Sequence, residues 1–589
     1  MAETKYYIEG VNGPVVTVKG GKGLAMMDMV SVGPEGLIGE VVSVEGDVTT
    51  VQVYEDTTGL MPGMPVEPQG APMSIQLGPG LLNNIYDGIC RPLRGIEEAT
   101  GAFIGRGIHI PTLDTEKKWD VTILVKPGDE LKPGQVYAEC DETPVIRHRS
   151  MMRPDQSGTV VSVVPDGAYT VTEPLVIVET QQGQKLELKL SQEWPIRTAR
   201  PVLERCAITR PLVTGQRIID TLFPLGKGGC AAIPGPFGAG KTVTQHQLAK
   251  WSDADLIVYL GCGERGNEMT EVLDEFSELI DPHTNQPLMY RTVLLANTSN
   301  MPVAAREASI YTGMTIAEYY RDMGYHVAMM ADSTSRWAEA LREISGRLEE
   351  MPAEEGFPAY LSSRLAEFYE RAGYMKTLCG REGSITVIGA VSPQGGDFSE
   401  PVTQNTKRFI RTFWALDRSL AYARHFPSIN WNQSYSEYLT DLAPWYQEHL
   451  GKDFLTLRAR LQTTLKEETS LNEIVKLIGS DILPEDQKLT IEIARVIRLG
   501  FLQQNSFNAT DTYVPMEKMK RMMEVVFRLY DSAKTLITKS IPLSQVKATG
   551  IFEKLIRIKY DIPNDDLSQF DAYDKAVDDA IASVVAAYK

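Results

Sequence analysis

The chain has 589 residues, which corresponds to roughly four domains at ~150 residues per domain. Hydrophobic residues make up 43% and charged residues 23%, a globular composition that excludes a disordered chain. The formal charge of −18 disfavours a basic nucleic-acid footprint. The Cys residues form no CxxC pair and the His residues no HExxH pair, so neither a zinc knuckle nor a dithiol redox pair is expected.

Membrane insertion is not indicated by any segment. The N-terminal residues Met1–Tyr6 lack an apolar signal core, and no run approaches the ~18–20 apolar residues of a membrane span. The thiols are expected to stay reduced, as in a cytosolic protein. Any role at a membrane should therefore be indirect.

The first part of the chain, residues 1–72, has the pattern of a small β-barrel. The β-branched runs Val15–Val18, Glu40–Val44 and Val48–Tyr54 are separated by Gly-containing turns. Short strands at this spacing are typical of barrels.

A second β-rich stretch covers residues 110–190. Its turn clusters are Lys126–Asp129 and Lys132–Gln135, and its strand candidates are Val160–Val164 and Leu175–Val178. Repeated Pro-Gly turns also occur in barrel-sandwich folds that carry lipoyl or biotinyl groups. Because no Lys lies in an obvious modification hairpin, we favour a structural barrel.

The central region alternates apolar strands with helical segments. The runs Leu256–Leu260, Thr292–Ala296 and Val327–Ala331 end at Gly261, Asn297 and Asp332. Continuous apolar strands alternating with helices predict a parallel sheet that is covered on both faces. From residue 436 the pattern is helical, and the last helix carries an apolar stripe that we expect to pack within the domain. The stripe consists of Ala576, Val577, Ala580, Ile581, Val584 and Val585.

The strongest chemical signal is a phosphate-binding loop of the form G-x-x-x-x-G-K-[ST]. It reads Gly235-Pro236-Phe237-Gly238-Ala239-Gly240-Lys241-Thr242. A strand candidate at Cys230–Ile233 precedes it and a helix candidate at Val243–Lys250 follows. Glycines let backbone N–H groups approach phosphate oxygens, and the helix N-terminus adds partial positive charge. Lys241 is expected to reach the β- and γ-phosphates, and Thr242 to ligate Mg²⁺.

Two further segments follow apolar strands and are predicted at the ligand-binding edge of the sheet. Asp332 is expected to hold Mg²⁺ through water, the alternative being a helix N-cap. In Gly261–Glu268, Glu264 could polarise the attacking water and Arg265 could spread phosphate charge. The alternative to these catalytic roles of Glu264 and Arg265 is a local ion pair that only stabilises the loop.

Over essentially its whole length the sequence resembles the catalytic A subunit of the V/A-type rotary ATPases, of the bacterial and archaeal type. The motifs that carry the resemblance are long. They are Gly235–Thr242, Gly261–Glu268, Ser299–Ala308, Ala331–Ala340 and Arg424–Trp431. The resemblance implies a multidomain fold: an N-terminal β-barrel, a RecA-like α/β nucleotide-binding core with a parallel sheet, an inserted β-rich bulge and a helical C-terminal domain. The expected boundaries are 1–72 for the barrel, 73–109 and 191–435 for the core, 110–190 for the bulge and 436–589 for the helical domain.

The resemblance also assigns site residues. Lys241, Glu264 and Arg265 would be catalytic, with Glu264 activating water and Arg265 contacting the γ-phosphate. Thr242 and Asp332 would serve the metal. The nucleotide would be bound by Gly235, Pro236, Phe237, Gly238, Ala239, Gly240, Lys241, Thr242 and Val243, together with Phe426, Gln504 and Phe507 near the adenine. Ordinary core packing is the alternative for Phe426.

The partners implied by the resemblance are B subunits, alternating with this chain in an A3B3 ring around a central stalk, and a peripheral stalk. The substrate would be ATP or ADP with Mg²⁺, and its hydrolysis or synthesis would drive H⁺ or Na⁺ transport. The chain would lie at the cytoplasmic face of the membrane and touch it only through the ion-translocating sector. An arginine finger would come from the neighbouring B subunit.

Two other classes of function are weighed against this one. A Rho-like hexameric nucleic-acid translocase needs basic and aromatic residues in an oligonucleotide site, which the N-terminal β-region lacks. A non-catalytic nucleotide-binding subunit is disfavoured by the intact Lys241 and Glu264. We therefore expect a catalytic subunit and no nucleic-acid partner.

Overall fold

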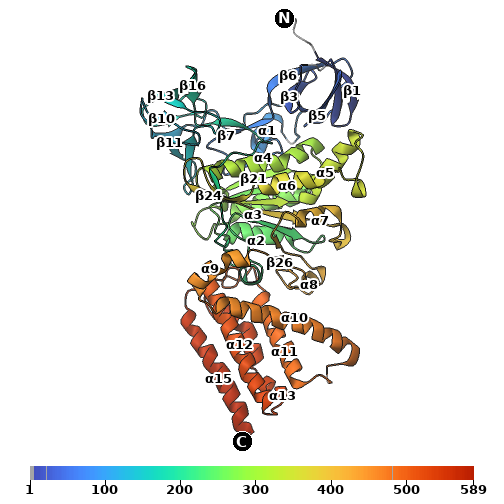
Figure 1. The fold of residues 1–589 in the computed structure, drawn as a ribbon, viewed down its shortest axis with the longest axis vertical. Coiled ribbons are helices and arrows are strands. Elements are labelled where there is room, and N and C mark those ends of the chain that lie inside the picture. The colour runs from blue at the N-terminus through green and yellow to red at the C-terminus, as the bar shows by residue number, and fades with distance from the viewer. Residues whose placement is uncertain (1–5, 21–22, 102, 481, 589) are drawn as a thin grey trace. The chain divides into compact units, whose positions relative to one another are not determined.

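The structure is a computed structural model that describes residues 6–20, 23–101, 103–480 and 482–588 (Figure 1). Residues 1–5, on which the expected lack of a signal core partly depends, lie outside these ranges. The chain forms two compact units. Unit 1 comprises Met1–Ala207, Lys227–Ala232 and Ala254–Ile410, and unit 2 comprises Ile208–Gly226, Ile233–Asp253 and Arg411–Lys589. Within the described ranges no helix combines the length and the apolar character needed to cross a bilayer.

A closed six-stranded barrel opens unit 1, with the strand order β1-β2-β5-β4-β3-β6 (blue in Figure 1). The strands are β1 (Tyr6–Asn12), β2 (Val15–Lys19), β3 (Asp28–Val32), β4 (Leu37–Glu45), β5 (Val48–Val53) and β6 (Pro65–Pro72). Because alternate side chains point to opposite faces, Val16 and Val18 share the interior with Val51 and Val53. Gly39 faces the same interior, where an added Cβ would approach Val51 Cγ1 to 2.7 Å. The predicted barrel is confirmed.

The predicted β-rich bulge consists of two antiparallel sheets, with strand orders β10-β13-β15-β16 and β12-β11-β9-β14. The strands are β9 (Trp119–Ile123), β10 (Glu130–Leu131), β11 (Val136–Asp141), β12 (Arg147–Met151), β13 (Gly158–Val163), β14 (Gly167–Tyr169), β15 (Val176–Glu179) and β16 (Lys185–Leu188). Gly128 and Gly134 in the two Lys-Pro-Gly turns have φ of 94° and 75°, a region that favours glycine. After the bulge, β17 (Gln192–Pro195) pairs with β7 (Ser74–Leu77), so the chain returns to the segment that it left.

The core of unit 1 is a sheet with the strand order β19-β24-β22-β20-β21-β8, in which the pairs from β24 to β8 are parallel. Its strands are β8 (Asn84–Tyr86), β19 (Cys230–Pro234), β20 (Leu256–Cys262), β21 (Thr292–Asn297), β22 (His326–Asp332) and β24 (Glu382–Val391). The antiparallel strands β23 (Gly373–Lys376) and β18 (Glu204–Cys206) continue from β24. The three strands predicted from apolar runs therefore lie side by side in parallel register.

Helices cover both faces of this sheet. Tyr259 on β20 packs edge-on against Phe276 of α3 (Gly266–Glu278), with ring centroids 5.6 Å apart. Its neighbour Val258 points to the opposite face, where it lies near Gly313 of α4 (Val303–Asp322). α5 (Thr334–Arg347) packs on β20 and β24, and α6 (Leu361–Glu370) packs on α4 (Figure 1). Strands buried on both faces explain why their sequences are continuously apolar.

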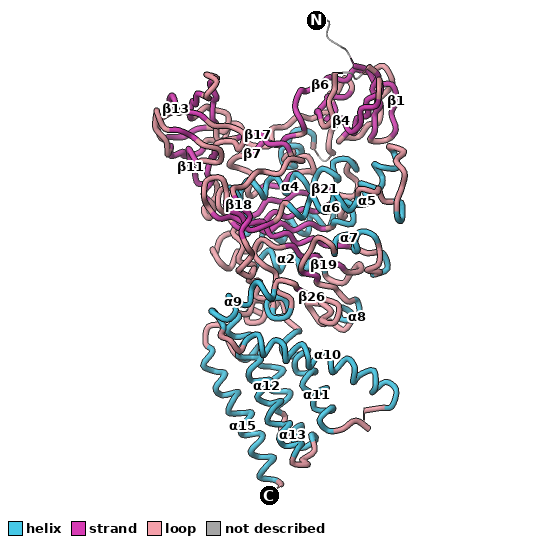
Figure 2. Tube along the Cα trace, in the orientation of Figure 1, coloured by secondary structure: helices cyan, strands magenta, loops and turns pink. Residues whose placement is uncertain are grey.

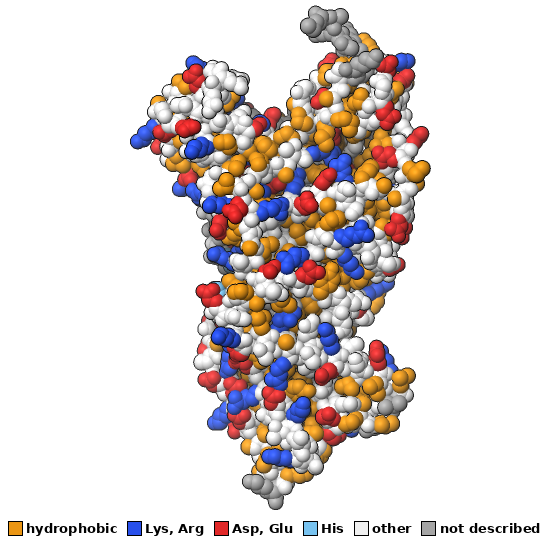
Figure 3. Space-filling model, in the orientation of Figure 1, with side chains coloured by type: hydrophobic (Ala, Val, Ile, Leu, Met, Phe, Trp, Pro, Cys, Tyr) orange, Lys and Arg blue, Asp and Glu red, His pale blue; other side chains and the backbone are white. Residues whose placement is uncertain are grey.

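Unit 2 begins with short elements and continues as a helical domain, which Figure 2 colours almost entirely as helix. The short elements are η1 (Ile218–Leu222), α2 (Lys241–Trp251), β25 (Thr412–Phe413), α8 (Arg418–Tyr422) and β26 (Tyr435–Ser436). The helical domain contains α9 (Leu439–Leu450), α10 (Phe454–Ile478), α11 (Glu485–Val496), η5 (Ile497–Leu502), α12 (Met516–Thr538), α13 (Leu543–Ala548), α14 (Ile551–Asp561) and α15 (Phe570–Ala587). Ion pairs Arg521–Asp574 and Arg528–Asp578 join α12 to α15. Basic and acidic side chains are interspersed on the visible face of these helices (Figure 3).

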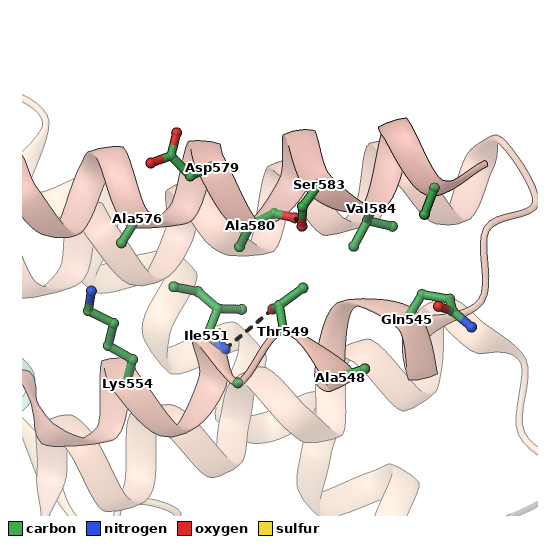
Figure 4. A pocket seen from close by; sticks show the side chains of 12 residues that line it. Gln545, Ala548, Thr549, Ile551, Lys554, Ala576, Asp579, Ala580, Ser583 and Val584 are labelled. Carbon is green, nitrogen blue, oxygen red and sulfur yellow. Dashed lines mark hydrogen bonds between the residues drawn. The ribbon is translucent and has the colours of Figure 1, made fainter. Parts of the chain in front are cut away.

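The apolar stripe predicted on the last helix packs within the domain, as expected. Val577 and Val584 of α15 are buried, and α15 contacts α12, α13 and α14. A groove of about 610 Å³ remains where α15 faces α13 and α14. Figure 4 shows Ala580 and Val584 facing Thr549 and Ile551 across it.

Candidate nucleotide-binding and catalytic site

The phosphate-binding loop lies between a strand and a helix, as predicted. β19 ends at Pro234, and α2 begins at Lys241 with Gly240 at its N-cap. Gly238 and Gly240 have φ of 77° and 90°. These positive φ values let the loop turn its backbone toward the start of α2, where the partial positive charge of the helix N-terminus favours an anion.

Side chains of this loop divide into buried and exposed sets. Ala239 is buried, whereas Phe237 and Val243 are exposed. The Lys241 ammonium donates hydrogen bonds to the carbonyls of Gly235 and Pro236, at 2.8 and 3.2 Å. The Lys241 side chain therefore lies over the phosphate-binding loop, and Thr242 lies in the first turn of α2.

Phe426 lies beside the phosphate loop within unit 2. A Cβ added at Gly240 would be 3.6 Å from Phe426 Cε1, and the hydroxyl of Ser428 donates to the carbonyl of Ala239. The Phe426 ring is 41% exposed, so it is available to a planar ligand. Its carbonyl accepts the N–H of Gln504 at 2.7 Å, which brings the third predicted segment to the same place.

Gln504 and Phe507 have different environments although they are three residues apart. Phe507 is 97% exposed. Gln504 is buried, and its amide group donates to the carbonyls of Gly215 and Asp511 while accepting the N–H of Arg217. The side-chain amide of Gln504 is thus fully hydrogen-bonded within the protein, whereas the ring of Phe507 faces solvent.

In unit 1, the carboxyl ends of three parallel strands bring the other predicted residues together. Gly261 on β20 is in register with Asp332 on β22, and Cys262 is in register with Asn297 on β21. Asp332 is 3% exposed, and Tyr259 Oη donates to its Oδ2 at 3.4 Å. The sheet edge therefore carries a buried carboxylate next to the loop that contains Glu264.

The loop after β20 is fixed through its backbone. The N–H of Gly263 donates to Asn297 O at 2.7 Å, and the N–H of Ser299 donates to Glu264 O at 2.9 Å. Arg265 is the N-cap residue of α3, its side chain is 67% exposed, and its Nε lies 3.9 Å from Glu268 Oε1. Because the side chain is largely exposed, the guanidinium is accessible to a ligand.

The electrostatic environment of Glu264 is unusual for a carboxyl. Burial, followed by the carboxylates of Asp332 and Glu268, raises the pKa of Glu264 to about 8, against an opposing effect of Arg336. A carboxyl with a pKa near neutrality is suited to proton transfer.

Arg336 of α5 received no separate role from the sequence. An added Cβ at Gly263 would be 2.6 Å from Arg336 Cβ, so this residue borders the Glu264 loop. Its guanidinium pairs with Glu339 at 2.9 Å. The sequence feature that could have identified Arg336 as a site residue is its position four residues after Asp332. That position is about one helical turn beyond the end of the strand.

The predicted site residues fall in both units. Lys241, Thr242, Phe426 and Phe507 belong to unit 2, whereas Glu264, Arg265 and Asp332 belong to unit 1. Among the described residues there is no group of three or more His, Cys, Asp or Glu side chains arranged to hold a metal ion.

Comparison with protein families first defines the class. The ATP synthase alpha/beta family, nucleotide-binding domain, matches residues 215–436, and its beta-barrel domain matches residues 8–70. The ATP synthase alpha/beta subunit barrel-sandwich domain matches residues 110–197, and the C-terminal domain of V and A type ATP synthase matches residues 443–547. The fold also resembles the solved structure of the assembled ATPase EscN of the enteropathogenic E. coli type III secretion system. That likeness has a TM-score of 0.63 at 21% identity and covers 89% of this chain and 99% of the other.

Comparison with individual relatives identifies the family within this ATP synthase class. The V-type ATP synthase alpha chain of Halothermothrix orenii is 61% identical over 95% of each chain. The V-type ATP synthase alpha chain 2 of Clostridium tetani is 57% identical over 99% of this chain and 98% of its own. The corresponding A-type ATP synthase chain of Methanopyrus kandleri, its A subunit, is 55% identical over 95% of each chain. The chain belongs to the family of V-type ATP synthase alpha chains and A-type ATP synthase A subunits, which confirms the resemblance seen in the sequence.

Proposed function

We propose that this chain is the nucleotide-hydrolysing subunit of a rotary ATP synthase or ATPase, coupled to H⁺ or Na⁺ transport. Membership of the V/A-type family supports the catalytic role. The observation that carries the proposal is the phosphate loop at the start of α2 with the half-exposed Phe426 beside Gly240. The phosphate loop suits a polyphosphate and the Phe426 ring suits a planar base. The preferred ligand is therefore a nucleoside di- or triphosphate.

The roles of the site residues follow from their chemistry. The N–H groups of the loop and the Lys241 ammonium would bind the phosphates of ATP or ADP. Glu264 would accept a proton from the attacking water, or orient it, and its raised pKa suits this role. The exposed guanidinium of Arg265 would contact the γ-phosphate.

Mg²⁺ fits the available donors. The hydroxyl of Thr242 and the carboxylate of Asp332 are oxygen ligands of the kind that Mg²⁺ prefers, and it usually takes only one or two protein carboxylates alongside phosphates and water. Asp332 is buried at a strand end, where a carboxylate is held in place. When bound, the ion would neutralise charge on the β- and γ-phosphates.

The wider assembly is also proposed. B subunits would alternate with this chain in an A3B3 ring, joined by central and peripheral stalk subunits, at the cytoplasmic face of a membrane. The domains would be a barrel at 1–72, a core at 73–109 and 191–435, a bulge at 110–190 and a helical domain at 436–589. The ranges matched by the four family models support these boundaries.

A reconstitution experiment tests this function. The full chain is mixed with the candidate B subunit, and the mass of the complex and its ATPase rate are measured with and without Mg²⁺. We expect an alternating ring with Mg²⁺-dependent turnover that RNA does not stimulate. A ring that forms without hydrolysing ATP would indicate a non-catalytic subunit, and stimulation by RNA would indicate a translocase.

A further inference from the structure

We propose that Arg217 and Asp511 are positioning residues that hold the segment Gln503–Asp511 in a preformed shape, so that Phe507 receives the base of the nucleotide. The inference rests on the proposed function, because it concerns the same nucleotide site. In this proposal the buried ion pair supports recognition of the base, and it has no part in binding the phosphates.

Arg217 is the centre of the arrangement. Its side chain is completely buried, and Nη1 donates to Asp511 Oδ1 at 2.5 Å. Nε donates to the carbonyl of Phe501, and Nη2 donates to the carbonyl of Gln503 at 2.8 Å. One guanidinium therefore connects the end of η5 with the far end of the segment.

The carbonyls that Arg217 contacts are those left free where a helix ends. η5 finishes at Leu502, and the last carbonyls of a helix have no partner within it. Lys559 supplies a second cation there, with Nζ donating to the carbonyls of Leu499 and Gln503 at 2.7 and 2.9 Å. Cations are favourable at a helix C-terminus because they oppose its partial negative charge.

Asp511 closes the segment from its other end. Its Oδ2 accepts the N–H of Asn505 at 2.7 Å, and its carbonyl accepts the Gln504 amide at 2.8 Å. The side chain of Asn505 in turn accepts the N–H of Phe507 at 3.0 Å. The backbone on the N-terminal side of Phe507 is thus fixed by a carboxylate that Arg217 holds.

The outcome of these contacts is an ordered segment with an exposed aromatic tip. Asp511 and Arg217 are fully buried, whereas Phe507 is 97% exposed. The Gln504 N–H, on the same segment, donates to Phe426 O, which ties the segment to the aromatic residue beside the phosphate loop. A large apolar side chain held in solvent by a buried ion pair indicates a binding role, and stacking on a planar heteroaromatic base is the contact that an exposed phenyl ring offers.

A comparison of two ligands separates base recognition from phosphate binding. We would measure the dissociation constants of MgADP and of magnesium tripolyphosphate for the full chain and for Asp511→Asn, Asn505→Ala and Phe507→Ala. The matched control is Asp531→Asn, which removes a carboxylate from the exposed pair Arg460–Asp531 in the same unit. We expect the three segment variants to bind MgADP about tenfold more weakly, with tripolyphosphate affinity unchanged within twofold and the control unchanged for both.

Turnover in the reconstituted complex gives a second readout that a loss of folding would not imitate. The KM for ATP should rise in Asp511→Asn and Phe507→Ala, with kcat within twofold of the parent. If Asp511→Asn does not fold, Asn505→Ala and Phe507→Ala decide the question, because Phe507 is on the surface. Unchanged MgADP affinity in these variants, or an equal loss for both ligands, would overturn the inference. A parent chain that binds neither ligand would instead remove the proposed function, and the inference with it.

Discussion

At the scale of single residues, Lys241 is the side chain on which turnover should depend most. Its ammonium lies over the phosphate loop, and it is the loop's basic side chain. We expect Lys241→Ala to reduce Mg-ATPase turnover of the assembled ring to background, because the charge on the transferred phosphate is no longer compensated. Assembly should be intact when mass is measured in parallel. A normal rate in this variant would exclude the proposed role.

The pKa of Glu264 predicts a pH dependence that a neighbouring substitution should change. The carboxyl must be ionised to accept a proton, so kcat/KM, which reports the free enzyme, should rise as pH increases through about 8. The Glu268 carboxyl contributes to this raised pKa. Glu268→Gln removes that contribution, so the acid limb should move to lower pH.

The control for this prediction is Glu271→Gln, an exposed residue on the same helix α3. Full pH profiles of kcat/KM for the parent and both variants provide the measurement. An acid limb that stays in place in Glu268→Gln, or that moves equally in Glu271→Gln, would contradict the assignment.

The place of Gln504 near the adenine, which the resemblance implies, stays a prediction. The structure adds the partners of its side-chain amide, which include Arg217 and Gly215, 287 and 289 residues earlier in the chain. No local pattern encodes such partners. Phe507 is exposed, and its contact with a base likewise stays a prediction.

At the scale of elements, α4 is held by a row of buried ion pairs along one face. Glu307, Glu318 and Asp322 pair with Arg197, Arg371 and Arg200 at 2.7, 2.6 and 2.6 Å. Positions 307, 318 and 322 are separated by 11 and 4 residues, close to whole turns of a helix, so they share one side. The N-terminal part of α4 also contacts α5, where Trp337 Nε1 donates to the carbonyl of Glu307 at 3.0 Å.

Removal of one carboxylate from this row should be costly. Glu318 is 1% exposed and accepts from Arg371 through both oxygens and from the N–H of Arg200. Glu318→Gln leaves a buried guanidinium without its counter-charge, and we expect a loss of about 3–5 kcal/mol in the stability of unit 1. Urea unfolding followed by intrinsic fluorescence measures this loss.

The control for Glu318→Gln is Glu367→Gln on α6, which breaks an exposed pair with Arg364. Exposed pairs contribute about 0–1 kcal/mol, so this variant should unfold close to the parent. Equal effects of the two substitutions would show that the row does not stabilise α4.

The strands were the best-predicted elements. Apolar runs located β20, β21 and β22 to within two residues, because strands buried on both faces must be continuously apolar. The π-helices η1 and η5 were not predicted. The end of η5 is held by Arg217, which donates to the carbonyls of Phe501 and Gln503, 284 and 286 residues later in the chain.

At the scale of the whole molecule, the chain alone should be a poor enzyme. The resemblance assigns the arginine finger to the B subunit, and such an arginine contributes about 10³–10⁵ in rate. We expect the purified full chain to hydrolyse ATP at least about 10³-fold more slowly than the chain with its partner, as measured by steady-state phosphate release. Full activity of a verified monomer would contradict this expectation.

The named relatives are ATP synthase chains, and in the proposed assembly the partner subunits would supply the ion pathway. The charge of −18 disfavours a nucleic-acid partner and does not identify the subunits that this chain touches.

The fold class, the phosphate loop and the family can be predicted from local patterns alone, because periodic apolar runs, glycine-rich loops and long motifs are recognised without any distant contact. Which side chains face a ligand, and which hold the site together, is known only from the folded chain. Three contacts join segments that are far apart in the sequence. Phe426 lies beside Gly240, the side-chain amide of Gln504 donates to the carbonyl of Gly215, and Arg217 forms a buried pair with Asp511. Burial and hydrogen bonding between such segments depend on how the whole chain folds, and no local stretch of sequence specifies them.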